Sequence, residues 1–230
     1  MTEVNSHRIE VATVDIRYGT ELVLHKAQLK IFGGGVHLLI GLNGAGKSSL
    51  LRSMAGLQSI QGGTITLNGQ DVHRMTAADR AQYLAFVAST PPRTSQLRVE
   101  EVLGLAAPAS ARIPKVLEQF GDARWLRRRL DALSDGEAQR VMFARAVLQG
   151  ASWLFMDEPT AFLDVPSRKE FWKHAIEVAK NDTTIVLATH DYEHLANSVD
   201  LASVHLIKAK GIASLDPLES PLQWTKRMEG

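Results

Sequence analysis

The segment Gly41 to Ser49, with the sequence GLNGAGKSS, has the residue types and spacing of a phosphate-binding loop. The template is a glycine, four residues, a second glycine, a lysine, and a serine or threonine. Glycine lets the backbone curl around phosphate oxygens, Lys47 brings a positive charge to the β- and γ-phosphates, and the Ser48 hydroxyl can bind Mg²⁺. The residues predicted to contact a nucleoside triphosphate here are Gly41, Asn43, Gly44, Ala45, Gly46, Lys47, Ser48 and Ser49.

Two acidic residues, Asp157 and Glu158, follow an apolar run farther along the chain. Asp157 is the expected partner of a phosphate-binding loop, since its carboxylate would hold Mg²⁺ directly or through water. Glu158 could orient or deprotonate the attacking water. The alternative is that adjacent acids merely begin a helix. His190 follows a second apolar run; together with His194 it could suggest zinc, but the glutamate pattern of zinc peptidases is missing.

The residues Leu133 to Glu137, with the sequence LSDGE, could act in either of two ways. Ser134 and Glu137 fit a capping box that begins a helix over Ala138 to Leu148. The same helix N-terminus, with Gly136 in its first turn, would expose backbone N–H groups to a second anion. A structural cap and an anion site are compatible, so both can hold together.

Strands are needed to place these groups on one edge of a sheet. The apolar runs Val36 to Ile40, Trp153 to Asp157 and Thr183 to Thr189 each lead into one of the polar groups above. Their alternation with helices, such as one over Glu170 to Lys180, predicts a parallel sheet that binds ligands at the carboxyl ends of its strands. A helix over Ser48 to Met54 completes the strand–loop–helix order, which disfavours a simple glycine turn without a ligand.

The first third of the chain is otherwise rich in predicted β-structure, and the segment after it is helical. The predicted strands are Ile9 to Ile16, Glu21 to Ile31, Ser59 to Asn68 and Leu84 to Val87, and a tight turn is expected at Asn68-Gly69. Thr76 is expected to cap a short helix. The helices predicted beyond Pro92 are Val99 to Ala107, Lys115 to Phe120 and Trp125 to Leu133.

The chain has 230 residues, a formal net charge of +1 and no cysteine. The balanced charge gives no general attraction to nucleic acid, and we interpret the basic run Arg127 to Arg129 as a solvated helix face near acidic neighbours. Without cysteine, disulfides and thiolate metal sites are excluded. No apolar run approaches the roughly 18 residues of a membrane helix, so a membrane role is expected to come through a partner.

Several motifs, taken in order, resemble those of the ATP-binding cassette (ABC) ATPases. LSDGEAQR resembles the signature sequence of that family, and MDEPTAFLD, from Met156 to Asp164, resembles its Walker B strand, catalytic glutamate and D-loop. Thr189-His190-Asp191 resembles the switch-histidine motif, and Tyr18 resembles the aromatic residue that stacks on adenine. The resemblance extends from about Arg8 to Gly211.

The resemblance implies an α/β fold, with a P-loop NTPase (RecA-like) core, a parallel sheet, an N-terminal antiparallel β subdomain and an inserted helical signature subdomain. The single ABC ATPase domain would span 1–230, with the β subdomain and core at about 1–90 and 150–230 and the helical subdomain at about 91–149. ATP with Mg²⁺ would lie between two copies paired head to tail, in contact with Lys47 of one copy. Glu158 would act on the water, His190 would contact the γ-phosphate, and Asp164 would communicate across the dimer. The implied signature contacts of the other copy are Ser134, Gly136 and Glu137.

Two positions depart from the family pattern. Ser89 stands after the strand Leu84 to Val87, where the family usually has a glutamine that senses Mg²⁺. A serine oxygen is on a shorter arm, so we expect any contact of Ser89 with the metal to need a bridging water. Asp135 stands at the first signature glycine. A carboxylate there suits the helix dipole but would repel a γ-phosphate, so we predict that the side chain turns away from the nucleotide.

The combination of LSDGE, DEPTAFLD and a lost glutamine resembles the ATPases that serve importers of iron–siderophore, haem or cobalamin complexes. It implies integral-membrane permease subunits, received at Ser89 to Arg98, and through them a substrate-binding protein. The chain is then expected to be cytoplasmic and peripheral on the inner face of the cell membrane, with no nucleic-acid partner. Two alternatives stay open: a soluble ABC-type ATPase uncoupled from any permease, working on DNA, ribosomes or cluster assembly, and a degenerate nucleotide-binding subunit of low activity.

Overall fold

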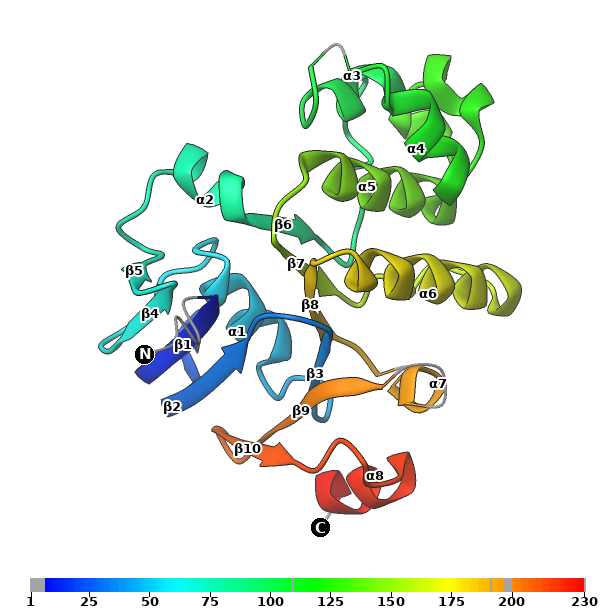
Figure 1. Cartoon of the computed structure of the whole chain (residues 1–230). Coiled ribbons are helices and arrows are strands. Elements are labelled where there is room, and N and C mark those ends of the chain that lie inside the picture. Colours follow the sequence, from blue (N-terminus) through cyan, green and yellow to red (C-terminus); the bar gives the residue numbers. More distant parts are fainter. Residues whose placement is uncertain (1–6, 109, 191, 197–199, 230) are drawn as a thin grey trace, which may run out of the picture.

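The computed structural model describes residues 7–108, 110–190, 192–196 and 200–229. Within these residues, the centre of the molecule is a sheet with the strand order β10-β9-β3-β8-β7-β6 (Figure 1). Neighbouring strands pair in parallel except β9 and β10, which form an antiparallel hairpin. The strands are β3 (Val36–Ile40), β6 (Leu84–Val87), β7 (Trp153–Asp157), β8 (Thr184–Ala188), β9 (Leu201–Lys208) and β10 (Gly211–Leu215).

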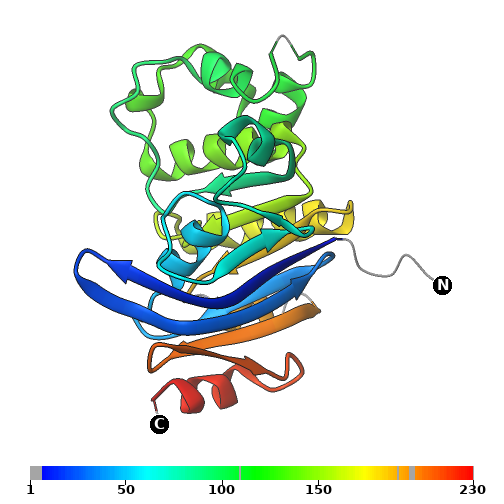
Figure 2. The same ribbon diagram turned by 90° about the vertical axis from the view of Figure 1, so that its left-hand side faces the viewer.

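A second, antiparallel sheet has the order β2-β1-β4-β5. Its long, curved strands β1 and β2 lie beside the core sheet, and β2 contacts β10 (Figure 2). Leu39 of β3 belongs to the apolar cluster between the two sheets, whereas Leu38 and Ile40 belong to the cluster on the helical side. This alternation follows from the period of two along a strand. The strands are β1 (Arg8–Tyr18), β2 (Glu21–Phe32), β4 (Thr64–Leu67) and β5 (Gln70–Asp71).

Helices cover the other face of the core sheet, and the segment from α3 to α5 projects from one side of the molecule (Figures 1 and 2). Helix α5 packs against both α3 and α4, and α4 also contacts α6. No helix among the described residues is both long and apolar enough to cross a bilayer. The helices are α1 (Lys47–Met54), α2 (Ala77–Tyr83), α3 (Val99–Gly104), α4 (Ile113–Phe120), α5 (Asp135–Gln149), α6 (Val165–Lys180), α7 (Tyr192–Ala196) and α8 (Pro221–Glu229).

The helix predicted over Trp125 to Leu133 is wrong. The chain forms two short 3₁₀ helices there, η1 (Ala123–Arg127) and η2 (Leu130–Ala132), with extended backbone between them. The cause is tertiary pairing: the N–H of Val99 donates to the Arg128 carbonyl (3.0 Å), and the N–H of Leu130 donates to the Leu97 carbonyl (2.9 Å). An α-helix would use these groups internally and could not pair with the residues before α3.

Two other predicted elements are shorter in the structure. The strand expected from Ser59 begins only at Thr64, because Gly62 and Gly63 adopt positive φ angles of 70° and 67°. Helix α3 ends at Gly104 rather than at Ala107. Neither difference moves the residues predicted to do chemistry.

Candidate active site

The glycine-rich loop connects β3 to the N-terminus of α1, as the sequence predicts. Gly46 precedes the helix with a φ of 105°, a conformation that residues with a side chain rarely adopt. A Cβ atom at Gly41 would lie 2.5 Å from the Ile207 carbonyl oxygen, so only glycine lets the loop pass so close to β9. The N–H groups of the first turn of α1 have no partner within the helix, and together with the helix dipole they favour an anion.

A cavity of about 340 Å³ lies over this loop. Tyr18, at the end of β1, is 70% exposed and lines the cavity, where its ring is free to stack on a base. Glu158 lines it as well. The complete lining is Tyr18, Glu21, Val23, Asn43, Gly44, Ala45, Gly46, Lys47, Ser48, Ser49 and Glu158.

The Lys47 ammonium is buried beneath the loop and is 7% exposed as a residue. Its Nζ donates to the carbonyl oxygens of Gly41 (2.8 Å) and Leu42 (3.3 Å). Burial lowers the pKa of Lys47, and the carboxylates of Glu158 and Asp157 oppose that shift. A phosphate would add to the opposite charge that the two carboxylates supply to this ammonium.

Asp157 lies at the carboxyl end of β7 and is 1% exposed. The Ser48 hydroxyl donates to its Oδ1 at 2.7 Å, and Arg52 Nη2 lies 3.4 Å from its Oδ2. Mg²⁺ prefers oxygen ligands, so this hydroxyl and carboxylate fit the metal that the sequence predicts. We did not predict Arg52 as a neighbour of this acid, although its place one helical turn after Ser48 puts both side chains on the same face of α1.

Glu158 and His190 meet at the ends of β7 and β8. Glu158 has a φ of 44°, which is uncommon for a residue with a side chain, and its N–H donates to the Ala188 carbonyl at 2.8 Å. Its Oε2 lies 3.2 Å from the His190 backbone nitrogen and 2.8 Å from His190 Nδ1. Strained backbone of this kind concentrates where a side chain must be aimed. Asp191 lies outside the described residues, and so does the side chain of His194.

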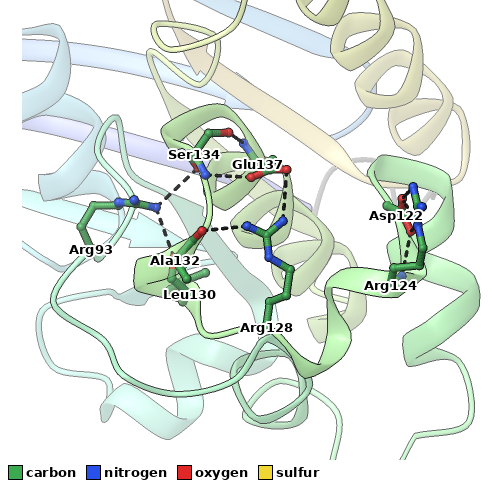
Figure 3. Close-up of polar contacts among 8 residues, drawn as sticks. All are labelled: Arg93, Asp122, Arg124, Arg128, Leu130, Ala132, Ser134 and Glu137. Carbon is green, nitrogen blue, oxygen red and sulfur yellow. Dashed lines mark hydrogen bonds and ion pairs between the residues drawn. The ribbon is translucent and has the colours of Figure 1, made fainter.

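A second cavity, of about 510 Å³, lies at the N-termini of α5 and α6. The predicted capping box is confirmed: Ser134 Oγ accepts from the Glu137 N–H at 3.2 Å, and Glu137 Oε2 accepts from the Ser134 N–H at 2.7 Å (Figure 3). Asp164 caps α6 by accepting from the Ser167 N–H at 2.9 Å, and the hydrogen bonds from Ser167 lower the pKa of Asp164. The lining is Trp125, Ser134, Asp135, Gly136, Glu137, Arg140, Phe162, Leu163, Asp164 and Ser167.

The predicted site residues therefore fall into two groups on one chain. The loop residues from Asn43 to Ser49, Tyr18 and Glu158 line the first cavity, while the signature residues and Asp164 line the second, and the two linings share no residue. Gly41, Asp157 and His190 belong to neither lining, although Asp157 and His190 contact Ser48 and Glu158 of the first. Half-buried Ser89 belongs to neither lining. Motif spacing did not identify Arg140, which lines the second cavity and donates to Ser167 Oγ at 2.5 Å.

The chain is similar in sequence to known proteins. A family profile described as "ABC transporter" matches residues 24–161. The chain is 34% identical over 194 residues to the iron(3+)-hydroxamate import ATP-binding protein FhuC of Bacillus subtilis (strain 168), covering 79% of this chain and 72% of that protein. It is 29% identical over 219 residues to the achromobactin transport ATP-binding protein CbrD of Dickeya dadantii (strain 3937), covering 89% and 80%.

The fold is also that of a solved structure described as the ATP binding subunit of an ABC transporter. The two superpose with a TM-score of 0.83 and 26% identity, over 96% of this chain and 99% of that one. This likeness confirms the predicted α/β P-loop NTPase fold, with its parallel core sheet, antiparallel sheet and helical segment.

Proposed function

The chain belongs to the ABC transporter family and is an ATPase subunit of a transporter, and we propose that this transporter imports a metal chelate. Two copies of the chain would bind two ATP molecules between them, head to tail, and their closing and opening would drive transport. The proposal has three parts: the shared site, the chemistry within it, and the cargo.

The separation of the two cavities is the observation that supports a nucleotide site shared between two copies. One cavity has a phosphate-binding loop but no signature residue, and the other has the signature helix N-terminus but no loop residue. Each offers backbone N–H groups of a helix N-terminus, which favour anions. A triphosphate held by the loop of one copy would present its γ-phosphate to Ser134, Gly136 and Glu137 of the other, beside Asp164.

The arrangement around Glu158 supports hydrolysis over a degenerate subunit. Its backbone is held by the N–H bond to Ala188 of β8, and its carboxylate contacts the backbone N–H and Nδ1 of His190. We assign it to hold and activate the attacking water. We assign His190 to the γ-phosphate once nucleotide is bound, and Lys47 to the β- and γ-phosphates. Ser48 and Asp157 would hold Mg²⁺, which would neutralise phosphate charge, and Ser89 would reach it only through water.

The partners follow from the family and from the charge of the chain. We assign Ser89 to Arg98 as the contact for integral-membrane permease subunits, and through them the chain would serve a substrate-binding protein. It would then work at the cytoplasmic face of the cell membrane, as one domain with a helical subdomain at about 91–149. A net charge of +1 gives no support for a nucleic-acid partner.

The cargo is assigned from the names of the relatives and from the LSDGE and DEPTAFLD motifs. Relatives are named for the import of iron(3+)-hydroxamate, hemin and cobalamin, and others for sulfate/thiosulfate. The first three cargoes are metal complexes, and the chain is 34% identical to the first of these relatives, so a metal chelate is the cargo we propose.

Co-purification from membranes tests the proposed function. We expect the tagged chain, expressed with its neighbouring genes, to purify with a membrane protein of several spans. In proteoliposomes containing that partner, a ferric hydroxamate should accumulate only with ATP, and Glu158→Gln should abolish the accumulation. Purification with ribosomes or DNA, and no membrane protein, would contradict import and favour the uncoupled ATPase.

A further inference from the structure

Arg93, in the loop that follows β6, reaches across to the residues that lead into the signature helix. Its Nη1 donates to the carbonyl oxygens of Leu130 (3.2 Å) and Ser134 (3.5 Å), and its Nη2 donates to that of Asp131 (3.1 Å). Its Nε lies 3.2 Å from Asp135 Oδ1. One guanidinium thus engages three carbonyl groups and one carboxylate, which its planar fork of donors allows and a lysine could not match.

The three carbonyl groups to which Arg93 donates lie between η2 and the start of α5. Those of Leu130 and Ser134 also accept backbone N–H groups, from Leu133 (3.3 Å) and Ala138 (2.9 Å). Arg128 contacts the same segment, the turn between η2 and α5. Its Nη2 donates to the Ala132 carbonyl at 2.7 Å, and its Nη1 lies 3.5 Å from Glu137 Oε1. Figure 3 shows Arg93 and Arg128 approaching this turn from two sides. Cationic side chains commonly satisfy the last carbonyl groups of a helix in this way.

The loop after β6 is tied to α5 at a second point. Gln139, which is fully buried, donates from Nε2 to the Ala88 carbonyl at 2.8 Å. Ala88 and Arg93 lie on either side of Ser89 in the sequence, so the loop that contains Ser89 contacts α5 or the residues leading into it on both sides of that serine.

We propose that Arg93 is a positioning residue that holds the Asp135 carboxylate away from the γ-phosphate of the ATP bound by a second copy. The inference rests on the proposed head-to-tail site. Two ion pairs lie at this end of α5, Asp135 with Arg93 and Glu137 with Arg128. Arg140 and Asp164 line the same cavity. Removing Arg93 would leave one carboxylate unpaired where a phosphate must approach, and like charges brought together at an interface weaken association strongly.

Nucleotide-driven dimerisation measures this effect without catalysis. In a Glu158→Gln background, the ATP concentration for half-maximal dimer would be determined with and without Arg93→Ala. We expect Arg93→Ala to raise that concentration roughly tenfold or more. Adding Asp135→Asn should restore it to within about twofold, because the unpaired charge is then gone. If Arg93 only supported the local fold, Asp135→Asn would not restore dimerisation.

Arg124→Ala is the matched control. Arg124 belongs to the same helical segment and forms an ion pair with Asp122, but the pair lies apart from the signature turn (Figure 3). We expect this variant to dimerise like the background protein. If it weakened the dimer as much as Arg93→Ala does, the effect would be a general loss of positive charge and the inference would be overturned.

Asp135→Asn alone, with Arg93 intact, provides a test that does not depend on the folding of Arg93→Ala. It should dimerise at an equal or lower ATP concentration, and a clear loss would overturn the inference. Dimerisation of Arg93→Ala equal to that of the background would overturn it too. If Glu158→Gln itself stays monomeric in ATP, the shared site fails first, and that result is distinct from a failure of Arg93 alone.

Discussion

Lys47 shows at the scale of a single residue how the structure prepares for a ligand. Its ammonium is buried and bonded to two loop carbonyl groups, while two carboxylates lie near enough to raise its pKa against the effect of burial. A charge in this setting is costly to desolvate and gains most from a multiply charged anion. Lys47 is therefore expected to contribute mainly to nucleotide binding.

Lys47→Ala should lower the affinity for ATP by about 10- to 100-fold, because charge-assisted hydrogen bonds contribute roughly 1.5–3 kcal/mol. Titration with a fluorescent ATP analogue measures the change, and thermal unfolding checks that the fold is kept. Lys30→Ala, which removes an exposed lysine paired with Glu10, should bind ATP like the unmodified chain. Unchanged affinity in Lys47→Ala would show that the loop does not use this charge.

Strands of the core sheet are joined by hydrogen bonds among two buried histidines and two serines that no motif indicated. His37 Nε2 donates to the Gly34 carbonyl at 2.9 Å, so its Nδ1 accepts from the Ser203 hydroxyl at 2.7 Å. Ser203 Oγ then accepts from His205 Nε2 at 2.7 Å, and His205 Nδ1 accepts from the Ser214 hydroxyl at 3.2 Å. Strands β3, β9 and β10 are thus linked by two neutral imidazoles.

These hydrogen-bonded histidines predict that the protein loses stability in acid. Burial lowers the pKa of both His37 and His205 to about 4, below the value of about 6.5 expected in an unfolded chain. The unfolded chain therefore binds protons first, so the contribution is fully present above about pH 6.5 and is lost as the pH falls toward 4. The loss amounts to roughly 3 kcal/mol per histidine.

Denaturant unfolding at pH 8 and pH 5 measures the part of that loss that is complete by pH 5, roughly 2 kcal/mol per histidine. We expect the double variant His37→Gln and His205→Gln to be less stable at pH 8 but to lose less stability on acidification than the unmodified chain. His25→Gln, which replaces an exposed histidine, should keep the full pH dependence. An equal pH dependence in the double variant would assign the acid sensitivity to other groups.

The strands and the helix cap that position the candidate site residues could be predicted from the sequence, because neighbouring residues define them. The apolar runs of β3 and β7 end at the residues predicted, and the Ser134–Glu137 cap depends on residues three positions apart. The turn from Trp125 to Leu133 could not be predicted, because its backbone pairs with residues near Leu97 rather than with itself. Side-chain partners that are distant in the sequence, such as Arg93 and Asp135, could not be predicted for the same reason.

The whole molecule has two separate cavities, and we propose that each of them is half of a nucleotide site. The phosphate-binding loop and Glu158 belong to one cavity, and the signature turn and Asp164 belong to the other. Within one chain the two linings share no residue, so under this proposal a triphosphate held by the loop would lack the signature contacts until a second copy bound. Pairing of the two copies would be driven by ATP and reversed by hydrolysis.

The mass of the Glu158→Gln variant in solution tests this pairing most directly. We predict that it has twice the mass of one chain when saturated with Mg²⁺ and ATP, and the mass of one chain with ADP or without nucleotide. Lys47→Ala in the same background should prevent the doubling, because the loop then binds ATP poorly. A variant that stays monomeric in saturating Mg²⁺ and ATP, even beside its membrane partner, would contradict the shared site.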